Sequence, residues 1–197
     1  MNNTVIVCVV VAAVLVVWAI MVYNRLMALR NRTGNALAQI DVQLKRRYDL
    51  IPNLVSVAKK YLEHESHTLE AVVRARGQAQ AAATALRTEP GKPEVAEAMV
   101  SAETALGGAL GRLMVLTESY PDLKADATMQ SLSEELNSTE NRIGYARQAY
   151  NDQVLEFNNA AKAFRAIVVA SVLGFHNMHM LQSTQSVEER QAVRVQF

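Results

Sequence analysis

The most apolar part of the chain lies close to its N-terminus. From Thr4 to Val22 it reads TVIVCVVVAAVLVVWAIMV, without a charged residue, a proline or a glycine. A helix rises about 1.5 Å per residue, so this segment is about 28 Å long, close to the thickness of the hydrocarbon core. The pattern predicts a transmembrane helix over 4–22, after a short N-terminus at 1–3. A cleaved signal peptide is disfavoured, because no basic residue precedes the segment and no small-x-small cleavage site follows it.

The charges that flank this helix predict its orientation. No Lys or Arg precedes it, whereas three arginines follow within ten residues. Because positive charge is retained on the cytoplasmic side, we expect the N-terminus outside and the chain from residue 23 onward in the cytoplasm. Aromatic rings favour the headgroup level of the bilayer. The expected membrane-proximal lipid contacts are therefore Trp18, Tyr23, Arg25, Arg30 and Arg32.

Beyond the membrane segment, apolar residues recur at steps of three and four. Such stripes run over 26–51, 54–86, 95–120 and 132–164. This spacing is typical of amphipathic helices, and the last stripe approaches the heptad seam of a coiled coil. The pattern predicts an all-α fold, a long antiparallel bundle of three to four helices over 23–181 into which the transmembrane helix continues. The apolar stretch 166–175 is too short for a second span.

Prolines and glycines divide the stripes. Pro52 predicts a kink in the first helix, because proline lacks an amide hydrogen and displaces the residue before it. We expect a loop near 88–93, where two prolines flank a glycine, and a break near 120–122 at Pro121. Gly107, Gly108 and Gly111 predict close approach of a neighbouring helix, with a bend beside a ligand as the alternative. The polar segment 182–197 has no core pattern and is expected to be a mobile tail.

Composition excludes several functional classes. Among 197 residues, 20 Lys and Arg oppose 19 Asp and Glu, so the net charge of +1 gives no reason to expect nucleic-acid binding. The lone Cys8 excludes an internal disulfide and a cysteine-based zinc site. His64 and His67 are weak metal candidates, since their spacing is not that of H-E-x-x-H and no third ligand is evident. With no phosphate loop or nucleophile elbow either, we predict no enzyme activity, no metal and no cofactor.

Two strings carry a family resemblance. The sequence IDVQLKRRYDLIPNLV begins at Ile40, and YPDLKA, ELNSTENRI and ARQAYN follow from Tyr120 onward. These segments resemble the signature of the LemA family. The resemblance implies a bacterial, membrane-anchored helical bundle with an external N-terminus and no catalytic residue set, and some relatives are associated with magnetosome membranes. The expected location is the bacterial inner (cytoplasmic) membrane, or an internal membrane derived from it, with one pass.

The charged residues of these strings lie far from the membrane segment. The Lys45-Arg46-Arg47 run is more than twenty helical residues beyond Val22, too far to reach the bilayer surface potential. An acidic region over 118–140 offers it a partner, within one subunit or between subunits. Solvent-exposed faces are the alternative, but we favour a buried or half-buried network that fixes helix register. The candidate assembly or partner-binding residues are Lys45, Arg46, Arg47, Glu140, Asn141 and Arg142.

These observations favour a non-enzymatic, single-span membrane scaffold or adaptor. Its cytoplasmic bundle is expected to form homo-oligomers or to bind an unidentified membrane or cytoplasmic protein. Anchoring in one membrane raises the effective concentration of identical stripes, which favours association even through weak contacts. The alternative is a lipid-binding or membrane-remodelling module, with a role like that of a magnetosome compartment protein, that uses the membrane-proximal arginines and the apolar stretch 166–175.

Overall fold

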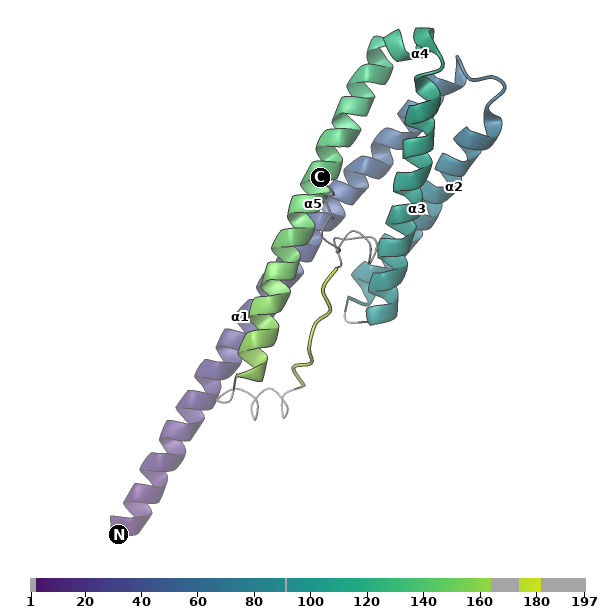
Figure 1. Cartoon of the computed structure of the whole chain (residues 1–197). Coiled ribbons are helices and arrows are strands. Elements are labelled where there is room, and N and C mark those ends of the chain that lie inside the picture. The colour runs from purple at the N-terminus through teal and green to yellow at the C-terminus, as the bar shows by residue number, and fades with distance from the viewer. Residues whose placement is uncertain (1–2, 91, 164–173, 182–197) are drawn as a thin grey trace, which may run out of the picture. The chain divides into compact units, whose positions relative to one another are not determined.

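The computed structural model describes residues 3–90, 92–163 and 174–181, and these residues form helices and connecting segments without a strand (Figure 1). The helices are α1 (Asn3–Lys59), α2 (Ser66–Thr88), α3 (Pro93–Thr117), α4 (Pro121–Ala125) and α5 (Ala127–Lys162). The all-α prediction is confirmed, with a long N-terminal helix that continues into a bundle. Residues 164–173 and the tail predicted at 182–197 lie outside the described part of the chain.

The chain forms two units, and α1 and α5 contribute to both. The first unit contains residues 3–36 of α1, residues 149–162 of α5 and the segment 174–180. The second unit contains the rest of α1 and α5 together with α2, α3 and α4. Each unit buries its own apolar residues, so each is described separately.

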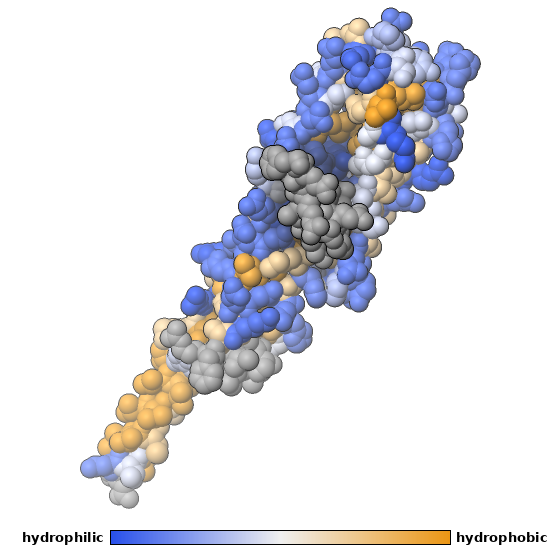
Figure 2. Space-filling model, viewed as in Figure 1, coloured by the Kyte–Doolittle hydropathy of each residue, from blue (hydrophilic) through white to orange (hydrophobic). Residues whose placement is uncertain are grey.

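In the first unit, the N-terminal part of α1 exposes nearly all of its apolar side chains. Val9, Val14 and Val16 are each more than half exposed, and none of the most apolar stretch of α1 is buried. Figure 2 shows this end of the helix as an almost continuous hydrophobic surface. Because so large an apolar surface is unfavourable in water, the helix indicates membrane anchoring.

The rest of the first unit encloses a small core between α1 and α5. Leu26 and Leu29 of α1 pack with Phe157 of α5 and with Phe175, whose ring also meets Tyr23 edge-on at a centroid distance of 5.8 Å. Asn158 holds the chain after Phe175 in place, because its side chain both donates to and accepts from the backbone of Met178, each at 2.9 Å. The described part of the C-terminal apolar segment therefore packs on the helices.

The second unit is built around α2 and α3, which pack on one another as an antiparallel pair (Figure 1). The buried face of α2 carries Ala75, Ala79 and Ala83, and small residues let helix backbones approach closely. The helix α3 begins at Pro93, where the missing amide hydrogen costs nothing. By length and composition α3 is a further candidate span, but a third of its most apolar stretch is buried and it carries the buried Glu103. We interpret it as a bundle helix.

A carboxylate caps α5 directly after the short helix α4. Asp126 Oδ1 accepts hydrogen bonds from the backbone amides of Thr128 and Met129, at 2.8 and 2.9 Å. Tyr61, from the turn after α1, donates its hydroxyl to the other oxygen at 3.0 Å. The amide of Met129 and the hydroxyl of Tyr61 lower the pKa of Asp126 below its ordinary value. The charged cap satisfies the free amides at the start of α5.

Pro52 lies inside α1, which continues beyond it to Lys59. A proline has no amide hydrogen, so the carbonyl of Tyr48, four residues earlier, loses its helical donor. Arg76 of α2 replaces that donor, since its Nε lies 2.7 Å from the Tyr48 oxygen. The proline thus creates a free carbonyl inside a helix, and a neighbouring helix uses it for attachment.

This arrangement predicts a coupling between Pro52 and Arg76. Replacing Arg76→Met keeps the aliphatic stem but leaves the Tyr48 carbonyl without a donor, which we expect to lower the free energy of unfolding by about 1–3 kcal/mol. In a Pro52→Ala background a new amide at position 52 satisfies that carbonyl. Arg76→Met should then lower the free energy of unfolding by less than half as much as it does in the wild-type protein. Urea unfolding followed by circular dichroism measures all four proteins. Arg74→Met, on an exposed position of the same helix, is the control. Equal costs in both backgrounds would contradict the coupling.

Candidate functional site: a buried charge network in the helical bundle

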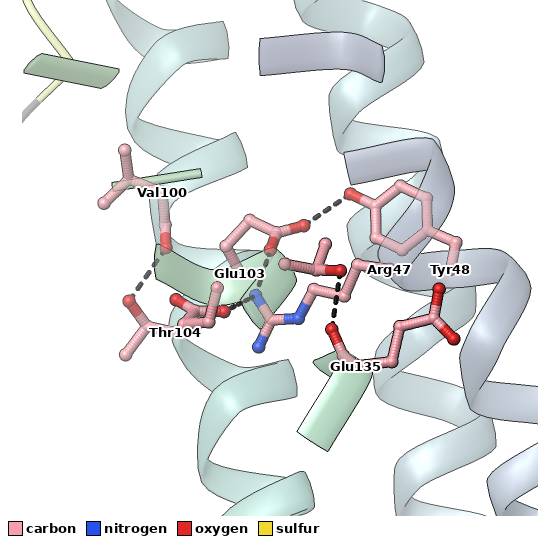
Figure 3. A network of polar contacts seen from close by, with 8 residues as sticks. Arg47, Tyr48, Val100, Glu103, Thr104 and Glu135 are labelled. Carbon is pink, nitrogen blue, oxygen red and sulfur yellow. Dashed lines mark hydrogen bonds and ion pairs between the residues drawn. The ribbon is translucent and has the colours of Figure 1, made fainter. Parts of the chain in front are cut away.

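Arg47 is a buried cation that joins three helices of the second unit. Its side chain is only 6% exposed, and its Nη1 lies 2.9 Å from Oε2 of Glu103, which is 2% exposed. The same nitrogen lies 2.8 Å from Oε2 of Glu140. Arg47 belongs to α1, Glu103 to α3 and Glu140 to α5, so one guanidinium connects the three elements (Figure 3).

Tyr48 completes the set of partners of Glu103. The Tyr48 hydroxyl donates to Oε1 of Glu103, while Arg47 contacts Oε2, so both carboxylate oxygens are occupied (Figure 3). Burial raises the pKa of the Tyr48 hydroxyl far above its ordinary value, and the negative charge of Glu103 raises it further. The hydroxyl therefore stays protonated and remains a hydrogen-bond donor.

The other predicted assembly residues lie around this network at the surface. Arg46 contacts Oε1 of Glu135 through both Nε and Nη2, at 3.2 and 2.6 Å, and Lys45 pairs with Asp49 one turn along α1. Both pairs are solvent-exposed, and exposed pairs contribute at most about 1 kcal/mol. The tribasic run therefore divides into one buried cation and two surface cations.

Asn141 and Arg142 differ from these residues. Both are exposed on α5, and neither forms a hydrogen bond or an ion pair with another residue in the part of the chain that the structure describes. Of the six predicted residues, the structure thus brings Arg47 and Glu140 together and leaves Asn141 and Arg142 open to solvent.

Glu103 and Tyr48 were not singled out by the sequence analysis. Glu103 follows Met99 by four residues and precedes Leu106 by three, so it shares the buried face of α3. Within the stripe predicted over 95–120, Ala102 also fits the helical spacing, and because alanine is apolar the pattern favours it over Glu103. A charged residue in register with an apolar stripe is the signal that would have identified it.

The three glycines of α3 do not mark a close helix approach, so that prediction is wrong. A methyl group added at Gly107 would meet Nη2 of Arg47 at 3.8 Å, an ordinary contact. Methyl groups at Gly108 and Gly111 would meet nothing within 4 Å.

The weak metal candidates lie apart from the network. His64 lies in the turn after α1 and His67 in the first turn of α2. Among the described residues, no three His, Cys, Asp or Glu side chains gather in a way that could hold a metal ion. The network itself is built from oppositely charged groups in contact, an arrangement that we expect to fix the register of the helices.

The network predicts a strong asymmetry between single and double substitutions. Arg47→Met leaves Glu103 as an unpaired buried charge, which we expect to lower the free energy of unfolding by about 3–5 kcal/mol. The double variant Arg47→Met/Glu103→Met removes both charges and should recover most of this loss. Arg46→Met, whose ion pair is exposed, should cost at most about 1 kcal/mol. Urea unfolding measures these values, and a double variant as unstable as the sum of its single variants would contradict the pairing.

The raised pKa of Tyr48 predicts a loss of stability in alkali. In the unfolded chain Tyr48 ionises near the ordinary tyrosine pKa of 10.0, whereas in the folded protein it stays neutral, so folding stability is retained below pH 10 and falls above it. One such group contributes a slope of up to about 1.4 kcal/mol per pH unit. Tyr48→Phe should make the fall above pH 10 shallower. Tyr145→Phe, at a ring that is 73% exposed, should leave the slope unchanged. An unchanged slope in Tyr48→Phe would refute the assignment.

Comparisons with known proteins agree with the fold and the strings described above. The profile of the LemA family matches residues 36–197. Magnetosome protein MamQ 2 of Paramagnetospirillum magneticum is 27% identical over 178 residues, which cover 83% of this chain and 65% of that protein. Magnetosome protein MamQ of Magnetospirillum gryphiswaldense is 26% identical over 171 residues, which cover 79% of this chain and 63% of that protein.

A third relative comes from a different kind of bacterium. Protein LemA of Metamycoplasma hominis is 25% identical over 162 residues, which cover 82% of this chain and 69% of that protein. The chain spans slightly less than two thirds of the length of the MamQ proteins. Because the family profile covers most of the chain, including the Arg47 network, the chain belongs to the LemA family.

Proposed function

We propose that this protein is a non-enzymatic, single-span membrane scaffold or adaptor. Its N-terminus lies outside and its bundle in the cytoplasm, at the bacterial inner membrane or an internal membrane derived from it. The bundle associates with further copies of itself or binds a membrane or cytoplasmic protein. The observation that carries the proposal is that one helix, α1, supplies both an unburied apolar segment and Arg47, the central cation of the charge network.

The proposal that the protein is not an enzyme is supported by the contacts of the charged groups in the Arg47 network. An acid, base or nucleophile must have a free position that a substrate can reach. Both oxygens of Glu103 are occupied, and Arg47 and Glu103 are almost completely buried. These groups hold helices together, so any partner must bind at the surface.

The surface offers one patch that suits a protein partner. Tyr145 lies four residues after Asn141 and three after Arg142, so its side chain neighbours both of theirs on the surface of α5. All three are exposed, and the Tyr145 side chain extends a large aromatic ring into solvent. Tyr and Arg are the residues that most often dominate protein interfaces. We name these three residues the α5 patch and propose it as the assembly surface.

A second candidate function is a lipid-binding or membrane-remodelling module. It is favoured by Arg25, Arg30 and Arg32, which are all exposed on α1 directly after the apolar segment. Cations at this position contribute about 1 kcal/mol each toward anionic lipid surfaces. The MamQ relatives are named as magnetosome proteins, which makes a role in an internal membrane compartment the natural form of this alternative.

The mass of the full-length protein in detergent tests the scaffold. We expect light scattering to give a defined oligomer, and Tyr145→Asp to weaken association by about thirtyfold, because an interface aromatic contributes about 2 kcal/mol or more. Circular dichroism and melting should stay unchanged, since Tyr145 is not part of the core. The control is Val115→Asp, at an equally exposed position on α3. A monomeric wild-type protein, or an equal loss in both variants, would exclude the α5 patch.

A further inference from the structure

A groove of about 530 Å³ lies in the first unit, between the end of the apolar segment of α1 and the last turns of α5. Its volume falls in the range of about 300–1,000 Å³ that is typical of small-molecule sites. Its walls include Trp18, Met21, Val22 and Arg25 from α1, and Glu156 and Asn159 from α5.

The groove has an apolar end and a polar end. Trp18, Met21 and Val22 belong to the exposed apolar segment that indicates membrane anchoring, whereas Arg25 begins the charged part of the helix. Tryptophan side chains settle where hydrocarbon meets headgroups. The groove therefore extends from the depth of acyl chains to the depth of headgroups, which is the direction in which a phospholipid lies.

The polar end carries opposite charges that have no side-chain partner among the described residues. Arg25, Glu156 and Asn159 are all exposed, and none of their side chains forms a hydrogen bond or an ion pair with any other residue in the ranges that the structure describes. One guanidinium, one carboxylate and one amide thus line a single groove, and within the described part of the chain their polar atoms are available to a ligand. A ligand that fits must present both an anion and a hydrogen-bond-donating cation.

We propose that this groove binds a phospholipid whose headgroup carries a phosphate and a primary ammonium, as in phosphatidylethanolamine. The Arg25 guanidinium and the Asn159 amide donate to the phosphate, and the Glu156 carboxylate accepts from the ammonium. The upper acyl chains lie against Trp18 and Val22. An anionic glycerol headgroup lacks the ammonium and is repelled by Glu156, and a quaternary choline has no hydrogen to donate.

The proposal goes beyond the scaffold function and depends only on membrane anchoring. A site with one positive and one negative charge selects a lipid by its headgroup, whereas the arginines alone would attract any anionic surface. The lipid site can therefore be disproved without disproving the α5 patch, and the reverse is also true.

Native mass spectrometry of the full-length protein tests the site. Detergent-solubilised protein is mixed with phosphatidylethanolamine, phosphatidylcholine or phosphatidylglycerol of identical acyl chains. We expect the ethanolamine lipid to be retained about tenfold more than the other two, the effect of one charge-assisted hydrogen bond. Arg25→Gln should lower this retention about tenfold, and Glu156→Gln should abolish the preference for ethanolamine over glycerol.

Matched controls lie on the same two helices. Arg30→Gln and Asp152→Asn remove exposed charges of the same sign that do not line the groove, and both variants should keep the preference. Equal retention of the three lipids, or an equal loss in the control variants, would overturn the proposal. A protein that retains no lipid while its mass doubles would assign the groove to a second copy of the chain and would also overturn it. Light scattering of the Tyr145→Asp variant reports separately on the scaffold.

Discussion

The ion pair between Arg47 and Glu103 constrains the bundle because neither charge can be buried without the other. Moving an ion out of water costs several kcal/mol, and the cost is offset only when partners satisfy the ion at close range. Glu103 receives Arg47 on one oxygen and the Tyr48 hydroxyl on the other. A shift of α3 by one residue along α1 would separate these groups and leave buried charges alone. The pair therefore contributes less to stability than to the choice of one helix register.

Tyr48 extends this constraint to α2. Its hydroxyl binds Glu103 of α3, and its backbone carbonyl, left free by Pro52, binds Arg76 of α2. The adjacent Arg47 contacts Glu140 of α5. Two neighbouring residues of α1 thus make polar contacts with each of the other long helices. A proline that would weaken an isolated helix here supplies the acceptor for an interhelical bond, so its cost to α1 is offset by the attachment of α2.

Much of this fold could be predicted from the sequence, and the limits follow from helix geometry. A long uncharged run and stripes with steps of three and four identify helices, because both properties are local. Partner choice is not local: Arg47 and Glu103 are 56 residues apart. The stripe of α3 admitted either Ala102 or Glu103, and preference for apolar residues selected the wrong one. The kink predicted at Pro52 is a local consequence of proline, whereas the bond from Arg76 to the Tyr48 carbonyl is not, because nothing in the local sequence links Arg76 to that carbonyl.

Charged side chains are paired with one another in one unit and exposed in the other. This difference indicates where a ligand or a partner can bind. In the second unit both oxygens of the buried Glu103 are engaged, and Arg47 contacts Glu103 and Glu140, so the buried charges already have partners within the protein. In the first unit Arg25 and Glu156 line one groove and remain unpaired within the described structure. An exposed charge is hydrated at little cost, so it can exchange water for a ligand, whereas breaking a buried pair costs several kcal/mol. Recognition is therefore expected at the membrane-proximal groove and the exposed α5 patch, while the Arg47 network keeps the helices in the register that presents that patch.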